Sequence, residues 1–224
     1  MPAKPKSAVK NVLIVDDHPM MRQGLAQLID NEPDLKVIAE ADTGGQGLDI
    51  VVKEKLDLAV LDISLPDRNG LELIKDIRSV KPELPVLIIS MHDEALYAER
   101  VLRAGARGYI MKQEGGHKLL QAIRQVLTGQ IYVSEKMSAR ILETFSGRKS
   151  EQSASPVAKL SDREFEVFQL IGQGKGTKEI AQHLNLSVKT VEVHRAKIKE
   201  KLSLLTATDL VRYAVRWAEA QGAV

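Results

Sequence analysis

Five short apolar runs recur through the first half of this chain, and segments with helical periodicity lie between them. The runs are NVLIV, LKVIAE, LDLAVLD, LPVLIIS and RGYIMK, which begin at residues 11, 35, 56, 84 and 107. Their nearly continuous hydrophobicity is typical of strands that are buried on both faces, as in a parallel sheet. In one intervening segment, Leu71, Ile74 and Ile77 share a helical face. The alternation predicts a doubly wound α/β domain with a five-stranded parallel sheet over residues 11–128.

The rest of the chain has a different pattern. A helix is expected over residues 134–145, capped by Ser134. Residues 146–158 are polar without periodic apolar positions, so residues 129–158 are predicted to be a linker that contains one helix. Residues 159–224 then show helical patterns throughout, which predicts a second, smaller all-α domain. The first ten residues are predicted to be a tail.

Charge also separates the two predicted domains. Residues 11–128 hold 14 Lys and Arg against 19 Asp and Glu, whereas residues 159–224 hold 11 against 8. An acidic first domain and a basic second domain indicate two modules with different partners. The chain has no cysteine, which excludes disulfides and thiolate metal sites. With no apolar run of transmembrane length and no signal-peptide pattern, we expect a cytoplasmic protein without a membrane partner.

Polar residues stand where the predicted strands end. Asp16 and Asp17 follow the first run directly, and Asp62 ends the third. Ser90 ends the fourth run and Lys112 ends the fifth. Ligands of open parallel sheets bind at the carboxyl ends of the strands. We therefore expect these five side chains to converge in one crevice.

Carboxylates that share a crevice repel one another unless a cation lies between them. Mg²⁺ suits such a place, because it takes one or two carboxylates, water molecules and a phosphoryl oxygen. The adjacent His18 is not expected to be a ligand, since Mg²⁺ prefers oxygen. With the ammonium group of Lys112 and the hydroxyl group of Ser90 beside it, a carboxylate can accept a phosphoryl group. An Asp-Asp pair alone is more often a solvated loop, so only the combination predicts this site.

These motifs resemble those of the receiver domain of two-component response regulators. The resemblance covers essentially all of residues 11–128, and it rests on VDD at 15–17, LDISLPDRNG at 61–70, IS at 89–90 and YIMK at 109–112. It implies a CheY-like receiver fold. This chain departs from the family pattern at Lys112-Gln113, because proline often follows the lysine in the family. We therefore expect a trans peptide bond or local strain there.

The resemblance also implies roles for individual residues. Asp62 is the expected phosphoacceptor. The expected Mg²⁺ ligands are Asp62 together with Asp16, Asp17 and the backbone carbonyl of Ser64. Ser90 and Lys112 are expected to contact the phosphoryl group. Tyr109 stands at the position of the switch aromatic, which turns inward as Ser90 moves toward the phosphate.

The basic last part of the chain has the layout of a helix-turn-helix. TKEIAQHL at 177–184 and VKTVEVHRAKIKEKL at 188–202 are predicted helices joined at Asn185 and Leu186, with Ser187 capping the second. Cations along the second helix suit contacts to phosphates and to the major groove. The residues of the second helix that we expect to face the core share one side of it: Val188, Val191, Ile198 and Leu202.

This region resembles the LuxR-type helix-turn-helix domain over residues 159–224. The resemblance rests on LSxRE at 160–164, KEIA at 178–181, SxxTVxxH at 187–194 and KL at 201–202. The two regions together resemble the NarL/FixJ family of response regulators. This resemblance implies that Val188 to Lys199 form the recognition helix. Glu192 is expected either to accept a hydrogen bond from cytosine or to pair with Arg195. The expected DNA contacts are Lys189, Thr190, Glu192, Val193, Arg195, Lys197 and Lys199.

The two resemblances imply a phosphorylation-controlled, DNA-binding transcriptional regulator. They imply no enzyme activity beyond slow Mg²⁺-dependent self-phosphorylation and autodephosphorylation. The implied partners are a sensor histidine kinase, double-stranded promoter DNA, RNA polymerase and, when phosphorylated, a second copy of the chain.

Two other hypotheses are weighed against this one. The first is an Mg²⁺-dependent phosphatase with an Asp nucleophile, but such enzymes often carry D-x-D, whereas Asp16 and Asp17 are adjacent. The second is a receiver that acts as an unphosphorylated interaction module, and the presence of all five site residues argues against it.

Overall fold

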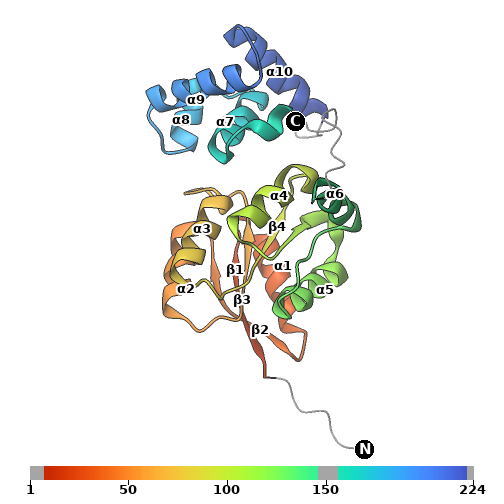
Figure 1. The fold of residues 1–224 in the computed structure, drawn as a ribbon. Coiled ribbons are helices and arrows are strands. Elements are labelled where there is room, and N and C mark those ends of the chain that lie inside the picture. The colour runs from red at the N-terminus through yellow and green to blue at the C-terminus, as the bar shows by residue number, and fades with distance from the viewer. Residues whose placement is uncertain (1–7, 146–155, 221–224) are drawn as a thin grey trace, which may run out of the picture. The chain divides into compact units, whose positions relative to one another are not determined.

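The computed structural model describes residues 8–145 and 156–220, and these divide into two compact units after Ser138 (Figure 1). Most of the predicted linker stretch at 146–158 and of the predicted tail at 1–10 therefore lies outside the described residues. Within the described part of the chain, no helix is long and apolar enough to cross a membrane.

The first unit is built on a parallel sheet, and the predicted α/β fold is confirmed. All five apolar runs form strands, and β3 and β4 are buried along their whole length. That burial explains why these runs show no polar alternation. In the order in which they lie side by side, the strands are β2 (Leu35–Ala41), β1 (Lys10–Val15), β3 (Leu58–Asp62), β4 (Val86–Ser90) and β5 (Gly108–Met111).

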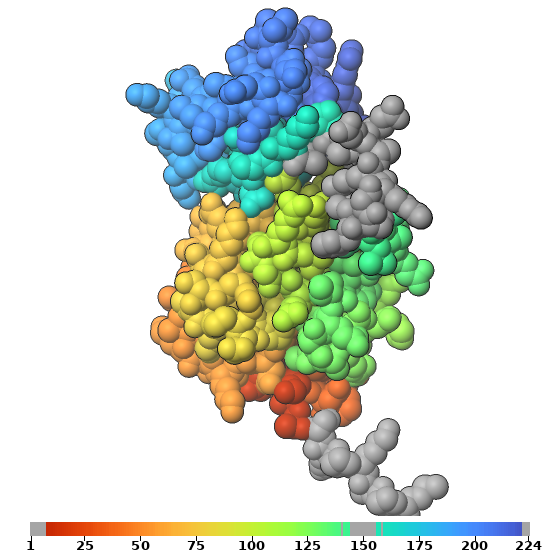
Figure 2. All heavy atoms as spheres, in the orientation of Figure 1, coloured from red at the N-terminus to blue at the C-terminus, as the bar shows by residue number. Residues whose placement is uncertain are grey.

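Helices cover both faces of this sheet (Figure 1). On one face, α1 (Pro19–Asp30) and α5 (Gly116–Leu127) add their apolar side chains to those of β1, β3 and β4 in one buried cluster. The other helices are α2 (Gly44–Lys53), α3 (Gly70–Val80) and α4 (Glu94–Ala104). Of these, α3 contacts both α2 and α4, and Figure 2 shows α3 and α4 side by side on the surface of this unit. The strand ends are thereby held between two helical layers.

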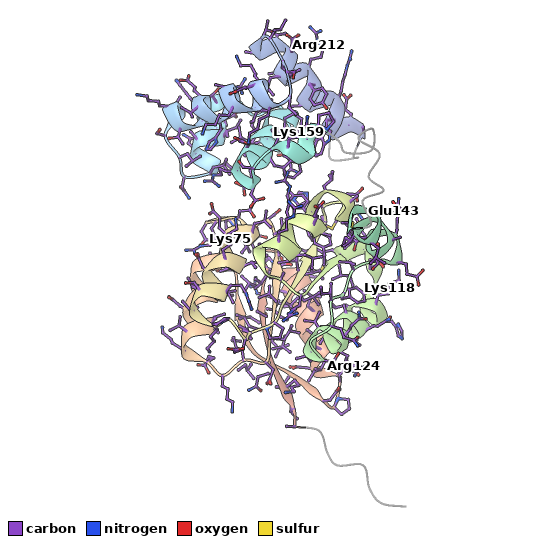
Figure 3. The ribbon with its side chains drawn as sticks, viewed as in Figure 1. Lys75, Lys118, Arg124, Glu143, Lys159 and Arg212 are labelled. Atoms are coloured by element: carbon purple, nitrogen blue, oxygen red, sulfur yellow. The ribbon has the colours of Figure 1, made fainter. Side chains whose placement is uncertain are left out.

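An exposed ion pair joins α5 to the loop that precedes β2. Arg124, which Figure 3 labels, lies on α5, and its Nη2 atom is 3.0 Å from Asp34 Oδ1. The hydrogen bond from Arg124 lowers the pKa of Asp34. Exposed pairs of this kind contribute at most about 1 kcal/mol. The buried apolar cluster, and not this pair, therefore holds α5 on the sheet.

The helix predicted within the linker is confirmed. It is α6 (Glu135–Phe145), and Ser134 caps it, because Ser134 Oγ accepts a hydrogen bond from Met137 N at 3.1 Å. Beyond the undescribed stretch, residues Pro156–Lys159 form a short 3-10 turn in which Val157 is buried. The sequence did not predict that turn.

The second unit is entirely helical among its described residues. Its centre is aromatic, since the rings of Phe165 and Phe168 lie 5.7 and 5.3 Å from the ring of Trp217. Trp217 is the single tryptophan of the chain, so its fluorescence reports on this unit alone. The helices are α7 (Asp162–Gly172), α8 (Thr177–His183), α9 (Val188–Lys201) and α10 (Ala207–Ala220).

The turn between α8 and α9 and most of the expected core face of α9 are confirmed. Asn185 adopts a left-handed backbone conformation, with φ of 50°, and Ser187 Oγ accepts a hydrogen bond from Thr190 N at 3.0 Å. Val191 and Ile198 are fully buried, and Leu202 is half-buried.

The core prediction is wrong for Val188, which is 41% exposed. A helical side chain leans over the turn that precedes its own Cα. Val188 is the first residue of α9 and has no such turn beneath it. Its side chain therefore stays near solvent although its position matches the apolar period.

Candidate functional site

The strand ends bring together two carboxylates and one ammonium group. Lys112, directly after β5, places its Nζ atom 2.7 Å from Asp16 Oδ2 and 2.7 Å from Asp62 Oδ2. The side chains of Asp16, Asp62 and Lys112 are only 0%, 4% and 3% exposed. The three residues come from the ends of β1, β3 and β5, as the parallel topology requires. Charges this well removed from water interact strongly.

Burial and charge act in opposite directions on these groups. Burial raises the pKa of Asp62 by more than the hydrogen bond from Lys112 lowers it. For Lys112, burial lowers the pKa, but the hydrogen bonds to Asp16 and Asp62 outweigh this effect and raise it. The ammonium group is therefore firmly protonated. Two carboxylates against one ammonium group still leave net negative charge in this crevice, so a further anionic group needs an added cation there.

Asp16 and Asp62 also belong to a larger group of potential metal ligands. Oxygen or nitrogen atoms of Asp16, Asp17, His18 and Asp62 all lie within 4.8 Å of one another. Three of these residues supply carboxylate oxygens, which are the ligands that Mg²⁺ prefers. His18 Nδ1 lies 2.7 Å from Asp17 Oδ1, and this contact accounts for the position of His18 without a metal. The donor set fits the expected Mg²⁺ site.

The loops after β3 and β4 meet beside Asp62. Ser64 N donates a hydrogen bond to Asp62 Oδ1 at 3.2 Å. Ser64 Oγ lies 3.0 Å from His92 Nε2, which joins the two loops. The buried hydroxyl oxygen of Ser90 accepts a hydrogen bond from His92 N at 3.2 Å. Ser90 is thus already tied to the loop that leads into α4.

Tyr109 lies inward in this structure. It is fully buried, and its hydroxyl group donates a hydrogen bond to the carbonyl oxygen of His92 at 2.7 Å. Burial raises the pKa of this hydroxyl, so it remains a donor. The peptide bond after Lys112 is trans, which is one of the two outcomes expected for the missing proline. The side chains of Asp16, Asp62, Ser90 and Lys112 are largely buried, whereas that of Asp17 is 34% exposed.

Gly70 sets the backbone that follows Asp62. Its N–H group donates to Ile63 O at 2.8 Å, so the first residue of α3 lies against the end of β3. A Cβ atom at this position would meet Asp62 O and Ile63 Cα, each at 2.7 Å. Only glycine allows this approach, and the position of Asp62 depends on it.

We expect Gly70→Ala to lower the free energy of unfolding of the first unit by about 2 kcal/mol, the typical cost of overpacking. Urea unfolding followed by circular dichroism measures this change. Gly24→Ala is the matched control, because a Cβ atom there has nothing within 4 Å, and within α1 the change should stabilise slightly. Equal stability of Gly70→Ala and wild type would contradict the close contact between Gly70 and the end of β3.

Sequence reasoning missed two contacts that position this site. The guanidinium group of Arg22 donates to the carbonyl oxygen of Asp16 at 2.6 Å, which fixes the start of the loop after β1. Asp67 accepts hydrogen bonds from Gly44 N and Gly45 N, both at 2.8 Å, and so ties the loop after β3 to α2. The Gly-Gly pair was a usable signal for a close backbone approach, whereas nothing in the sequence marks Arg22.

The candidate DNA-contact residues lie on α9. Lys189, Glu192 and Lys197 are exposed, and Val193 is 47% exposed. The other three candidates are half-buried, and they are Thr190, Arg195 and Lys199. The exposed stripe of α9 therefore carries most of the predicted contacts.

A partly buried ion pair holds the C-terminal end of α9. Lys201 Nζ lies 2.6 Å from Glu164 Oε2, and the Glu164 side chain is 4% exposed. Glu164 also completes a capping box with Ser161 at the start of α7. Beside it, Arg163 donates to the carbonyl oxygen of Leu184 at 2.7 Å, where α8 ends. Through these contacts, residues of the LSxRE motif join α7, α8 and α9.

Comparison with known proteins agrees with both halves of this description. The family described as "Response regulator receiver domain" matches residues 12–124, and the family described as "Bacterial regulatory proteins, luxR family" matches residues 158–214. The chain belongs to the NarL/FixJ family of response regulators. This response regulator is accordingly a phosphorylation-controlled, DNA-binding transcription regulator and not a classical enzyme.

Individual relatives align with this response regulator over nearly its whole length. The oxygen regulatory protein NreC of Staphylococcus haemolyticus is 37% identical over 209 residues, which cover 92% of this chain and 96% of NreC. NreC of Staphylococcus aureus gives the same identity and coverage.

Among solved structures, RcsB of Salmonella typhimurium matches with a TM-score of 0.70 and 26% identity, covering 93% of this chain and 98% of RcsB. RcsB of Salmonella enterica serovar Typhimurium, bound to promoter P1flhDC in the presence of phosphomimetic BeF3⁻, matches with a TM-score of 0.67 and 25% identity. That match covers 92% of this chain and 98% of RcsB.

Proposed function

We propose that Asp62 accepts the phosphoryl group that controls this response regulator. The observation that carries the proposal is the position of Lys112 Nζ, 2.7 Å from both Asp62 and Asp16 at the carboxyl edge of the sheet. Asp62 accepts hydrogen bonds from both Lys112 and Ser64 N, and its backbone lies against Gly70 at the start of α3. An Asp that is buried beside a cation suits a nucleophile whose product is more negative than the starting carboxylate.

Four groups are suited to hold Mg²⁺ at this place. They are the carboxylates of Asp16, Asp17 and Asp62 and the backbone carbonyl of Ser64. Mg²⁺ bound there supplies positive charge that offsets the charge on the phosphoryl oxygens. Because Lys112 takes one oxygen of Asp62 at 2.7 Å, it also orients the carboxylate for attack.

The transfer step is a displacement at phosphorus. A carboxylate oxygen of Asp62 forms the new P–O bond while the P–N bond to the phosphohistidine of a sensor kinase breaks, and the imidazole leaves with the electron pair. Lys112 pairs with the incoming phosphoryl oxygens, and the Ser90 hydroxyl donates a hydrogen bond to them. The same arrangement allows slow reaction with small phosphoryl donors and slow hydrolysis of the product.

The phosphoryl group acts on the rest of the unit through Ser90. When the Ser90 hydroxyl turns to the phosphoryl oxygens, its hydrogen bond with His92 N is lost, and His92 O is the acceptor of the Tyr109 hydroxyl. This chain of contacts favours one arrangement of β4, α4 and β5. We propose that this arrangement favours a homodimer, which doubles the DNA contacts and so raises affinity steeply.

Helix α9 is the proposed recognition helix for double-stranded promoter DNA. Lys189, Glu192 and Val193 stand on its exposed stripe near the N-terminus, where recognition helices contact base edges. Thr190, Arg195, Lys197 and Lys199 are proposed to contact bases or phosphates beside them. The structures of RcsB bound to promoters support promoter DNA as the partner of this chain.

The remaining partners follow from the same proposal. A sensor histidine kinase supplies the phosphoryl group, and RNA polymerase is the machinery that a promoter-bound regulator acts on. We place the protein in the cytoplasm, where these partners and promoter DNA are found.

Intact mass measurement tests the phosphoacceptor directly. The full-length protein is treated with Mg²⁺ and acetyl phosphate, and we expect it to gain the mass of one phosphoryl group. Asp62→Asn should gain none, because the amide cannot attack phosphorus. Asp57→Asn is the matched control, since Asp57 pairs with Lys10 away from the cluster, and it should be labelled like wild type. A gain that survives Asp62→Asn would refute the assignment.

A further inference from the structure

The outer edge of the sheet is covered by residues 130–134, which we call the edge segment. β5 is the last strand in the sheet. Tyr132 N donates to Arg107 O at 3.0 Å, and Tyr109 N donates to Tyr132 O at 2.9 Å. Together these bonds form a short parallel bridge between Tyr132 and Gly108. The edge segment is therefore bonded to the backbone of the same tyrosine whose hydroxyl contacts His92.

A close approach at Gly108 makes this pairing possible. A Cβ atom on Gly108 would meet Tyr132 O at 3.0 Å, Tyr132 Cβ at 3.2 Å and Leu87 Cδ1 at 2.9 Å. The first of these atoms belongs to the backbone and cannot rotate away. The fit between β5 and the edge segment therefore depends on the absence of a side chain.

The edge segment leads into α6 and is tied to α4 at that point. Ser134 N donates to Glu94 Oε1 at 2.7 Å, and Glu94 is the first residue of α4. Ser134 is also the cap of α6. At the other end of the segment, the Gln125 side chain donates to Ile131 O at 2.6 Å. The start of α6 is thus fixed by β5, α4 and α5 together.

We propose that the edge segment transmits the state of Asp62 to α6, and so to the chain that leads to the DNA-binding unit. The path runs from Ser90 to the backbone of His92, from His92 O to the Tyr109 hydroxyl, and from Tyr109 N to Tyr132 O. Each of these steps is a hydrogen bond, and the bond from Ser134 N to Glu94 ties the same segment to the start of α4, which follows the loop of His92. The inference rests on the proposed function, because it assumes that phosphorylation at Asp62 changes these contacts.

Variants at Glu94 test this coupling without touching the phosphoryl site. Glu94→Ala removes the acceptor of Ser134 N, whereas Glu94→Gln keeps an oxygen at the same position and should rescue the contact. Glu99→Ala is the surface control on α4, since Glu99 pairs only with the exposed Arg103 among the contacts resolved for its carboxylate. Gly108→Ala is an independent variant that displaces Tyr132 from β5.

Two quantities are measured on each full-length variant. Hydrogen exchange follows the amides of Tyr132 and Ser134, and a DNA titration gives the ratio of dissociation constants without and with Mg²⁺ and beryllium fluoride. In Glu94→Ala we expect exchange at Ser134 to quicken about tenfold and the ratio to fall at least fivefold. Phosphorylation by acetyl phosphate, read by intact mass, should stay at the wild-type level. Glu94→Gln and Glu99→Ala should keep the wild-type ratio.

The possible failures are distinguishable. If exchange quickens in Glu94→Ala but the ratio stays at the wild-type value, the edge segment does not carry the signal and the inference is overturned. If wild type itself shows a ratio of one, the proposed function fails and the inference fails with it. Should Gly108→Ala not fold, the comparison of the two Glu94 variants alone decides.

Discussion

Lys112→Met is expected to cost about 3 kcal/mol of the free energy of unfolding of the receiver unit when no divalent cation is present. The substitution leaves the carboxylates of Asp16 and Asp62 buried without the ammonium group that lies 2.7 Å from each. Removing one partner of a buried ion pair typically costs 3–5 kcal/mol. Adding Mg²⁺ should restore much of the loss, because the cation offsets the same two charges. Thermal unfolding with and without Mg²⁺ measures both effects.

The same variant should also lose its response to phosphorylation. Without the ammonium group, the phosphoryl oxygens lack the partner that draws the strand ends together, so we expect the change in DNA affinity to fall at least about tenfold. Lys118→Met is the matched control, because Lys118 is exposed on α5 and pairs only with the nearby Glu114 among its resolved ion pairs (Figure 3). It should change neither stability nor the response. A Lys112→Met protein as stable as wild type without Mg²⁺ would contradict the charge arrangement described here.

Glu164→Gln is expected to destabilise the DNA-binding unit by about 2 kcal/mol at pH 7, a typical cost for weakening a charge-assisted hydrogen bond whose acceptor is buried. Glu164 joins α7 to α9 through Lys201, at 2.6 Å, and accepts at the cap from Ser161 N at 2.7 Å. Unfolding in urea, followed by the fluorescence of Trp217, isolates this unit within the full chain. Glu200→Gln on the exposed side of α9 is the control and should stay within about 0.5 kcal/mol of wild type.

The pH dependence of this contact has a definite sign. Burial raises the pKa of Glu164, but the hydrogen bonds from Lys201 and Ser161 outweigh burial and lower it below the ordinary value of 4.5. A lowered pKa in the folded state means that the contact stabilises above pH 4.5 and loses this effect as the pH falls through the folded value. The difference between wild type and Glu164→Gln should therefore shrink on acidification. A difference that grows toward low pH would exclude this ion pair as the cause.

Much of the receiver unit could be predicted from the sequence for a simple reason. Strands buried on both faces leave continuous apolar runs, and parallel strands put their carboxyl ends at one edge. Asp16, Asp62 and Lys112 could therefore be placed together although 96 positions separate the first from the last. Family motifs added the expected roles of these residues.

Contacts between distant backbone groups could not be predicted in this way. The pairing of Tyr132 with Gly108 and the hydrogen bond from Gly44 N to Asp67 join segments that share no sequence period. Such contacts depend on where loops happen to meet once the core has packed. Val188 shows a different limit of sequence reasoning. An apolar period predicts which face of a helix points to the core, but not where along the helix the core stops covering that face.

The most direct test of the central claim is a titration of full-length protein against promoter DNA. Dissociation constants are compared without and with Mg²⁺ and acetyl phosphate, for wild type and for Asp62→Asn. We predict that phosphorylation tightens binding by wild type at least about tenfold, and that Asp62→Asn binds as weakly as the untreated protein in both conditions. Equal affinity of wild type in the two conditions, or a response that survives Asp62→Asn, would contradict control of DNA binding through Asp62.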